Sequence, residues 1–222
     1  MRAQIVEVAA GLLAAGGRDA VSTRAVAAAA GTQAPTIYRL FGDKDGLLAA
    51  VLEYGFAKYL ADKPPHDPAA DPIAELRAGW DLHVDFGLAN RELFLLMYGD
   101  TQPGKRPAAA EAGLAILRTR IHNLAAAGRL SVDVDLAVDL VQAAGSGTVL
   151  TLLALPTQSR DPRLSDTMFN AVVTTITTAP NAHESAGPVV AANALRVYLP
   201  ELGMLTDGER QVLGEWLARI TH

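Results

Sequence analysis

Apolar side chains recur three or four residues apart along most of the chain. This spacing predicts helices, because residues so spaced share one face of a 3.6-residue repeat. The β-branched stretch near residue 172 would suit a strand, yet no partner strand is visible in the sequence. We therefore expect an all-α protein. The predicted helices span residues 3–15, 22–30, 33–41, 44–62, 71–88, 91–98, 108–127, 133–155, 165–178, 189–198 and 206–220.

Two short helices near the amino terminus are separated by a tight turn. Ser22 can cap the first helix by accepting a backbone N–H bond, and Gly31 supplies the flexible backbone of the turn. Pro35 suits the first turn of the second helix, Gly42 ends that helix, and Asp43 can cap the next one. This arrangement predicts a helix-turn-helix, whose second helix enters the DNA major groove.

Polar side chains on the second helix are the candidates for reading DNA. Gln can pair with adenine, Arg with guanine, and methyl groups can touch thymine. The predicted base-reading residues are Gln33, Ala34, Thr36 and Arg39. The predicted phosphate contacts, which fix register without reading sequence, are Thr23, Tyr38 and Lys44, with Arg24 as a further candidate. The alternative is that Tyr38 is a core aromatic residue and Arg39 a solvated charge.

Several segments of this region resemble the DNA-binding domain of TetR-type transcriptional regulators. They are STRAVA at 22–27, AG at 30–31, TIYRLF at 36–41, DK at 43–44 and Leu47, within residues 5–52. The resemblance implies a homodimer that binds an operator, with a small-molecule pocket enclosed by the carboxy-terminal helices. Gln33, Ala34 and Gly42 depart from residues frequent in the family, which leaves the operator sequence open.

The domain boundary is expected at a proline-rich segment. Residues 63–72 contain four prolines, which cannot sit inside a helix. We therefore expect a DNA-binding domain over residues 1–62, with 44–62 as its linking helix, and a ligand-binding and dimerisation domain over residues 63–222. Residues 1–63 hold seven Lys or Arg and six Asp or Glu, against 12 and 18 in the remainder. This is a weak basic footprint for a nucleic-acid-binding domain.

Composition narrows the class of protein further. Half of the 222 residues are hydrophobic and only 5% are aromatic, which favours helices packed through small and aliphatic side chains. The absence of cysteine excludes disulfides and thiolate metal sites. No apolar run approaches the roughly 20 residues of a membrane span, and the start lacks a signal-peptide layout. We expect a cytoplasmic protein without a membrane segment, metal or cofactor.

A second group of side chains is predicted to line the small-molecule pocket that the resemblance implies. Such a site is usually an apolar cavity with a few polar groups. The candidates are Trp80, His83, Phe86, Phe94, Met97, Tyr98, His122 and Thr148. Aromatic and methionine side chains at helical spacing are more often plain core, and this alternative stays open.

The expected dimer surface is the helix over 133–155 together with the helix over 165–178, a choice guided by the family resemblance. The first contains Gly145 and Gly147, each of which costs about 1 kcal/mol of helix propensity. Such a cost is usually tolerated where another backbone or a ligand comes close. A dimer is also expected because one recognition helix makes too few base contacts to select a genomic site.

Enzymatic interpretations find little support, and no catalytic residue is predicted. No two histidines have the i, i+4 spacing of a helical zinc site. Ser146 lies between two glycines but follows a helix rather than a strand, unlike a nucleophile elbow. Two alternatives to a ligand-responsive repressor stay open: a helical small-molecule-binding enzyme with a vestigial DNA-binding fold, and a ligand-independent regulator controlled by a protein partner.

Overall fold

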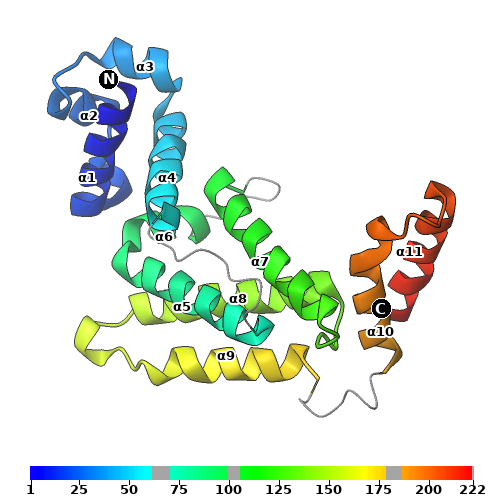
Figure 1. The fold of residues 1–222 in the computed structure, drawn as a ribbon. Helices are drawn as coiled ribbons and strands as arrows, with labels where there is room; N and C mark the ends of the chain where they lie inside the picture. The colour runs from blue at the N-terminus through cyan, green and yellow to red at the C-terminus, as the bar shows by residue number, and fades with distance from the viewer. Residues whose placement is uncertain (62–70, 100–105, 179–186, 222) are drawn as a thin grey trace. The chain divides into compact units, whose positions relative to one another are not determined.

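The computed structural model describes residues 1–61, 71–99, 106–178 and 187–221. Its α-helices are α1 (Arg2–Ala20), α2 (Thr23–Ala29), α3 (Ala34–Phe41), α4 (Lys44–Ala61), α5 (Pro72–Ala89), α6 (Arg91–Tyr98), α7 (Ala108–Ala126), α8 (Val134–Leu153), α9 (Arg163–Ile176), α10 (Pro188–Tyr198) and α11 (Asp207–Thr221) (Figure 1). Within the described ranges the only β-type pairing is an isolated bridge between Leu130 and Thr177. The predicted all-α class is confirmed.

Side-chain caps explain why several helices begin where the sequence predicts. The Asp71 carboxylate accepts the Ala74 N–H at 3.1 Å and starts α5. Thr206 and Glu209 form a capping box at the start of α11, with the Glu209 carboxylate accepting the Thr206 N–H at 2.8 Å. Because such bonds satisfy the free N–H groups of the first turn, they fix helix starts from short stretches of sequence.

The first helix is interrupted at Gly16 and Gly17, directly after its predicted end at residue 15. Both glycines have non-helical backbone angles, and helical residues resume beyond this kink up to Ala20. Gly17 has a φ of 67°, and a Cβ atom placed there would lie 3.0 Å from a carboxylate oxygen of Glu92. The two glycines therefore break the helix at the point where it lies next to Glu92 of α6.

The chain divides into two compact units, and the first comprises Met1–Pro65 and Asp85–Gly113. Its core is formed by α1 to α4, and Leu93 and Leu96 of α6 pack against it. A Cβ atom at Gly55 of α4 would lie only 2.6 Å from Leu93 Cδ1, so α4 and α6 approach closely there. The proline-rich boundary segment lies largely outside the described residues, and the division at residue 62 stays a prediction.

The second unit comprises His66–Val84 and Leu114–His222. In this unit α8 and α9 pack side by side, and α10 pairs with α11 (Figure 1). Asn193 of α10 is fully buried and donates to the Val132 carbonyl at 2.7 Å. Arg196 donates to the Asp133 carboxylate at 3.1 Å. These contacts attach α10 to the segment that precedes α8.

The most apolar helix of the structure is α8. Among the described residues, this helix alone is long and apolar enough to cross a membrane by length and composition, with a mean hydropathy of 1.5. Its apolar sequence is interrupted by the charged residues Asp135 and Asp139. About 44% of the apolar window is buried inside the structure. One such helix is weak evidence of a membrane segment, because the core helix of a soluble protein passes the same test.

Candidate nucleic-acid interface

The two helices of the predicted motif have the expected local geometry. The Ser22 hydroxyl accepts the Ala25 N–H at 3.1 Å and caps α2. Gly31 has a φ of 61°, the left-handed conformation that the turn between α2 and α3 requires. Val26 of α2 and Ile37 of α3 have no exposed surface, so the two helices share one core. Gln33 precedes α3 with extended backbone angles but makes no side-chain cap.

The predicted base-reading residues lie on the outer side of this pair. Gln33 and Arg39 are exposed, whereas Ala34 and Thr36 are partly buried. Tyr38 is 53% exposed, which contradicts the alternative that it is a core aromatic residue. The surface of α3 thus presents an amide, a guanidinium and a phenol to solvent, the hydrogen-bonding groups that DNA contacts use.

Two of the predicted phosphate contacts lie next to each other. The hydroxyl oxygens of Thr23, at the start of α2, and Tyr38, in α3, are 3.4 Å apart. Their donors can turn toward one phosphate oxygen, since hydroxyl hydrogens rotate freely. Arg24 is exposed beside them. Among the described residues, neither Arg24 nor Arg39 has an ion pair, so both guanidinium groups are available to an anion.

Lys44 has a structural contact as well as its predicted role on DNA. Its ammonium group donates to the Arg18 carbonyl at 3.0 Å, near the end of α1. Arg18 also pairs with Asp45 at 3.3 Å. The start of α4 is thereby joined to the end of α1. Arg2 is the first residue of α1, and its guanidinium lies 5.2 Å from the centre of the Phe41 ring.

Four of the predicted pocket residues belong to the second unit. Trp80 is buried, donates to the Ser165 hydroxyl at 2.9 Å and packs edge-on against Phe169. A Cβ atom at Gly145 would lie 3.4 Å from the His83 ring and 3.5 Å from the Trp80 ring, so this glycine brings α8 close to both. Thr148 is buried and donates to the Ala144 carbonyl of its own helix.

His122, the fourth of these residues, is half-buried on α7. Burial lowers the pKa of its imidazole, and the positive charges of Arg118 and Arg196 lower it further, against an opposing effect of Asp135. His122 is therefore held toward its neutral form, in which one ring nitrogen donates a hydrogen bond and the other accepts one.

The other four predicted pocket residues belong to the first unit. Phe86 is buried, with its ring centre 4.4 Å from that of Tyr59. Phe94 is completely buried and lies 4.6 Å from Tyr98, ring centre to ring centre. Met97 is buried as well. The structure thus places Trp80 and His83 beside Gly145, and Phe94 beside Tyr98, and the eight-residue pocket stays a prediction.

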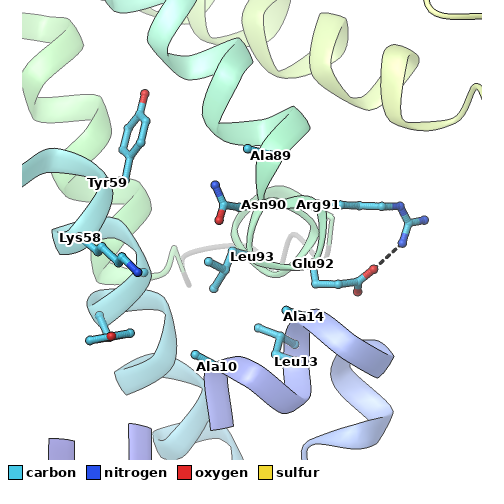
Figure 2. Close-up of a pocket in the computed structure, with 12 residues that line it drawn as sticks. Ala10, Leu13, Ala14, Lys58, Tyr59, Ala89, Asn90, Arg91, Glu92 and Leu93 are labelled. Atoms are coloured by element: carbon cyan, nitrogen blue, oxygen red, sulfur yellow. Dashed lines mark hydrogen bonds and ion pairs between the residues drawn. The ribbon is translucent and has the colours of Figure 1, made fainter. Parts of the chain in front are cut away.

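A cleft within the first unit was not predicted. It has a volume of about 460 Å³ and is lined by Ala10, Leu13 and Ala14 of α1, Tyr54, Gly55, Lys58 and Tyr59 of α4, and residues 89–93 around the start of α6. Figure 2 shows Lys58 projecting from α4 on one side of the cleft and Arg91 paired with Glu92 on the other side. The small residues Ala10 and Ala14 of α1 are visible in the sequence, but only the packed structure shows that the start of α6 lies opposite them.

The described residues contain no group of three or more His, Cys, Asp or Glu side chains that could hold a metal ion.

The buried carboxylate of Asp133 has a structural role. Burial opposes its ionisation, but hydrogen bonds from the Asp135 and Leu136 N–H groups and from Arg196 outweigh this effect and lower its pKa. The charged carboxylate caps α8 and anchors α10.

Comparison with known proteins gives the helix-turn-helix a family. The family described as bacterial regulatory proteins, tetR family, matches residues 5–51. No curated protein matches the chain at a significant level.

Solved structures share the fold over a longer stretch. A transcriptional regulator of the TetR/AcrR family from Thermobifida fusca YX-ER1 is 22% identical, with a TM-score of 0.57 over 78% of this chain and 96% of its own. A TetR variant from Acinetobacter baumannii AYE in complex with minocycline is 20% identical, with a TM-score of 0.59 over 77% and 93%. A protein of unknown function from Rhodococcus sp. RHA1 is 24% identical, with a TM-score of 0.63 over 80% and 95%.

The family match covers the helix-turn-helix, and the shared fold covers about four fifths of the chain. Residues 5–51 are therefore identified as a domain of the tetR family of bacterial regulatory proteins, on a chain that shares its fold with solved TetR-type regulators.

Proposed function

We propose that the protein is a cytoplasmic, homodimeric transcriptional repressor that binds a roughly palindromic operator and is released by a small molecule. The observation that carries this proposal is the exposed polar surface of α3 on a helix-turn-helix frame whose Val26 and Ile37 are fully buried. A rigid frame with a solvated amide and guanidinium on its outer helix suits base reading. Gln33 and Arg39 would read bases, whereas Thr23, Tyr38 and Lys44 would contact phosphates.

The surface of α8 supports the dimer. Along this helix Leu136, Ala143, Gly147, Thr151 and Ala154 are exposed and recur at helical spacing. Leu136 is 50% exposed, although most apolar residues of α8 are buried. A stripe of mostly small side chains lets another helix approach closely.

The buried side of α9 limits its contribution to this surface. Phe169 and Ile176 are buried within the unit itself, so they do not face a partner. Only more exposed positions of α9, such as Ala171 and Thr175, are available beside α8.

Support for a ligand comes from the neighbourhood of Gly145. Trp80 and His83 meet the glycine-interrupted stretch of α8, where a polar ring lies within an apolar surround. The solved A. baumannii TetR variant of the same fold holds minocycline. By analogy, a small apolar molecule with a hydrogen-bonding group is the expected effector class.

Fluorescence anisotropy with labelled DNA flanking the protein's own gene tests the proposal. A saturable shift that unlabelled specific DNA removes, and that random DNA removes only at far higher concentration, is the expected result. Equal competition by both DNAs would contradict operator binding. The same assay addresses a ligand-independent regulator, which would bind the operator but ignore every candidate effector.

Ligand control has a thermodynamic requirement. If an effector weakens operator binding by some factor, operator must weaken effector binding by the same factor, with a coupling of about 1–3 kcal/mol typical. Calorimetry of an identified effector with and without operator measures this factor directly. Equal effector affinity in both titrations would show that the pocket does not control DNA binding, and turnover of the compound would favour the enzyme alternative.

A further inference from the structure

The cleft between α1, α4 and the start of α6 has features of a ligand site that the proposed function does not use. All of its lining residues belong to the first unit, the one that contains the helix-turn-helix. Its volume of about 460 Å³ lies within the range of roughly 300–1,000 Å³ that small-molecule sites usually occupy.

The walls of this cleft favour a flat apolar group. Four of the lining residues, Ala10, Ala14, Gly55 and Ala89, carry a methyl group or no side chain at all. Leu13 is almost completely buried beneath them. Tyr54 and Tyr59, which are half-buried on α4, supply aromatic surface on which a ring can stack.

The charges of the cleft favour an anion. Its three charged side chains are Lys58, Arg91 and Glu92. Arg91 and Glu92 pair with each other, with a nitrogen–oxygen distance of 2.5 Å. Lys58 is exposed and has no ion pair among the described residues, and Figure 2 shows it projecting from α4. The positive charge left without a counter-charge therefore lies at the mouth of the cleft.

Asn90 adds a polar group on the wall opposite Lys58. Its amide nitrogen donates to the Phe86 carbonyl at 3.1 Å, which fixes the orientation of the side chain. An apolar cleft with one unbalanced cation and one oriented amide matches a ligand with a ring at one end and a carboxylate at the other.

We propose that this cleft binds an aromatic carboxylate, with its ring between the tyrosines and the small residues of α1 and its carboxylate on Lys58. This site lies within the DNA-binding unit and is separate from the pocket expected around Trp80 and His83. The inference does not rest on the proposed function, since binding is measured on the protein alone. Operator binding can fail while this site is real, and the reverse also holds.

The test is calorimetric titration of the full chain, without DNA, with 1-naphthoate and with its neutral analogue 1-naphthamide. We expect saturable binding of naphthoate to the native protein and at least tenfold weaker binding of naphthamide. Lys58→Gln should weaken naphthoate binding about tenfold and leave naphthamide binding unchanged, whereas Lys58→Arg should retain naphthoate binding. A lost charge contact accounts for both results.

A second pair of variants locates the site. Ala14→Leu places a larger side chain into the cleft at an exposed helical position and should abolish binding of both probes. Ala57→Leu is the matched control, because Ala57 is exposed on α4 but does not line the cleft. Circular dichroism verifies that each variant is folded. Absence of saturable naphthoate binding, or equal binding by the native, Lys58→Gln and Ala14→Leu proteins, would overturn the proposal.

Discussion

The hydroxyl groups of Thr23 and Tyr38 approach to 3.4 Å across the junction of α2 and α3. Two residues that are 15 positions apart in sequence thus form one polar group at the face expected to meet DNA. A hydroxyl group contributes a hydrogen bond to a phosphate rather than a full opposite charge. Their contribution to DNA binding should therefore differ from that of a lysine in its dependence on salt.

Tyr38→Phe should weaken binding to every DNA sequence equally, by about 0.5–1.5 kcal/mol, because one neutral hydrogen bond is lost. The slope of log affinity against log salt should not change, since no counterion-releasing charge is removed. Lys44→Gln is the comparison, and it should reduce the slope by about 0.9 for its phosphate. Anisotropy titrations at several salt concentrations measure both. A Tyr38→Phe protein with altered base preference would show that Tyr38 reads sequence.

Arg39→Ala and Gln33→Ala should relax selectivity at particular base pairs, at a cost of about 1–3 kcal/mol each. Both side chains are exposed on or beside α3, and Arg39 has no ion pair among the described residues, so little stability should be lost. Competition against operators with single base-pair changes identifies the position that each side chain reads. A uniform loss across all these operators would assign the two residues to phosphate contacts instead.

Gly147→Leu should disrupt the dimer, whereas Gly147→Ala should be tolerated within one chain. A Cβ atom at Gly147 meets nothing within 4 Å in the monomer, so alanine should stabilise α8 by up to about 1 kcal/mol. The leucine should overpack a close helix contact by about 1–3 kcal/mol if α8 faces a partner. Sedimentation velocity at micromolar concentration measures the outcome. A native monomer would contradict the proposed dimer, and an undisturbed Gly147→Leu dimer would place the interface elsewhere.

Asp133 should contribute to stability in two separable ways. Asp133→Ala removes the cap of α8 and leaves Arg196 without its partner, with an expected cost of about 2–4 kcal/mol. Asp133→Asn should cost less, because asparagine is also a good helix cap. Urea unfolding of the three proteins measures the difference. Equal costs for both variants would mean that the ion pair, rather than the cap, matters.

The lowered pKa of Asp133 adds a pH dependence to this comparison. Its folded-state pKa lies below the unfolded value of about 3.9, so its stabilising effect is complete above that value. The effect is lost as the pH falls toward the folded pKa. The native protein should therefore lose its advantage over Asp133→Asn only in acid, and a constant difference down to pH 3 would contradict this.

His122 should make the native protein less stable as the pH falls below about 6.5. Burial, Arg118 and Arg196 lower its folded-state pKa, so the unfolded chain takes up a proton first. Stability then rises with pH between the folded and unfolded pKa values and is constant above them. His122→Gln should flatten this part of the curve. Urea unfolding between pH 5 and pH 8 tests it, and parallel curves for the two proteins would contradict it.

Most helix limits were predictable because they depend on nearby residues. Ser22 and Thr206 cap α2 and α11 through groups only three residues away. The position of Gly17 beside Glu92 was not predictable, since Glu92 lies on a helix far along the chain. The cleft beside Lys58 was missed for the same reason. Residues of α1, α4 and α6 meet there only after long-range packing.

The exposure of α3 was largely predictable, because the pattern of Ile37, Leu40 and Phe41 defines its inner side. The contact between Thr23 and Tyr38 was not, since it depends on the crossing angle of two helices. The sequence therefore predicts which residues of α3 face outward, and the structure adds that Tyr38 lies next to Thr23 of α2.

The linkage of α3 to α4 turns a small rotation into a large displacement at the DNA. Only Gly42 and Asp43 separate the two helices, and the Asp43 carboxylate caps α4 through the Gly46 N–H at 2.8 Å. The 18 residues of α4 form a rod of about 27 Å. Tilting such a rod by about 5° at its Ala61 end moves the opposite end by roughly 2.4 Å. Successive base pairs are about 3.4 Å apart along the duplex, so a rotation of a few degrees displaces the recognition helix by most of one base pair.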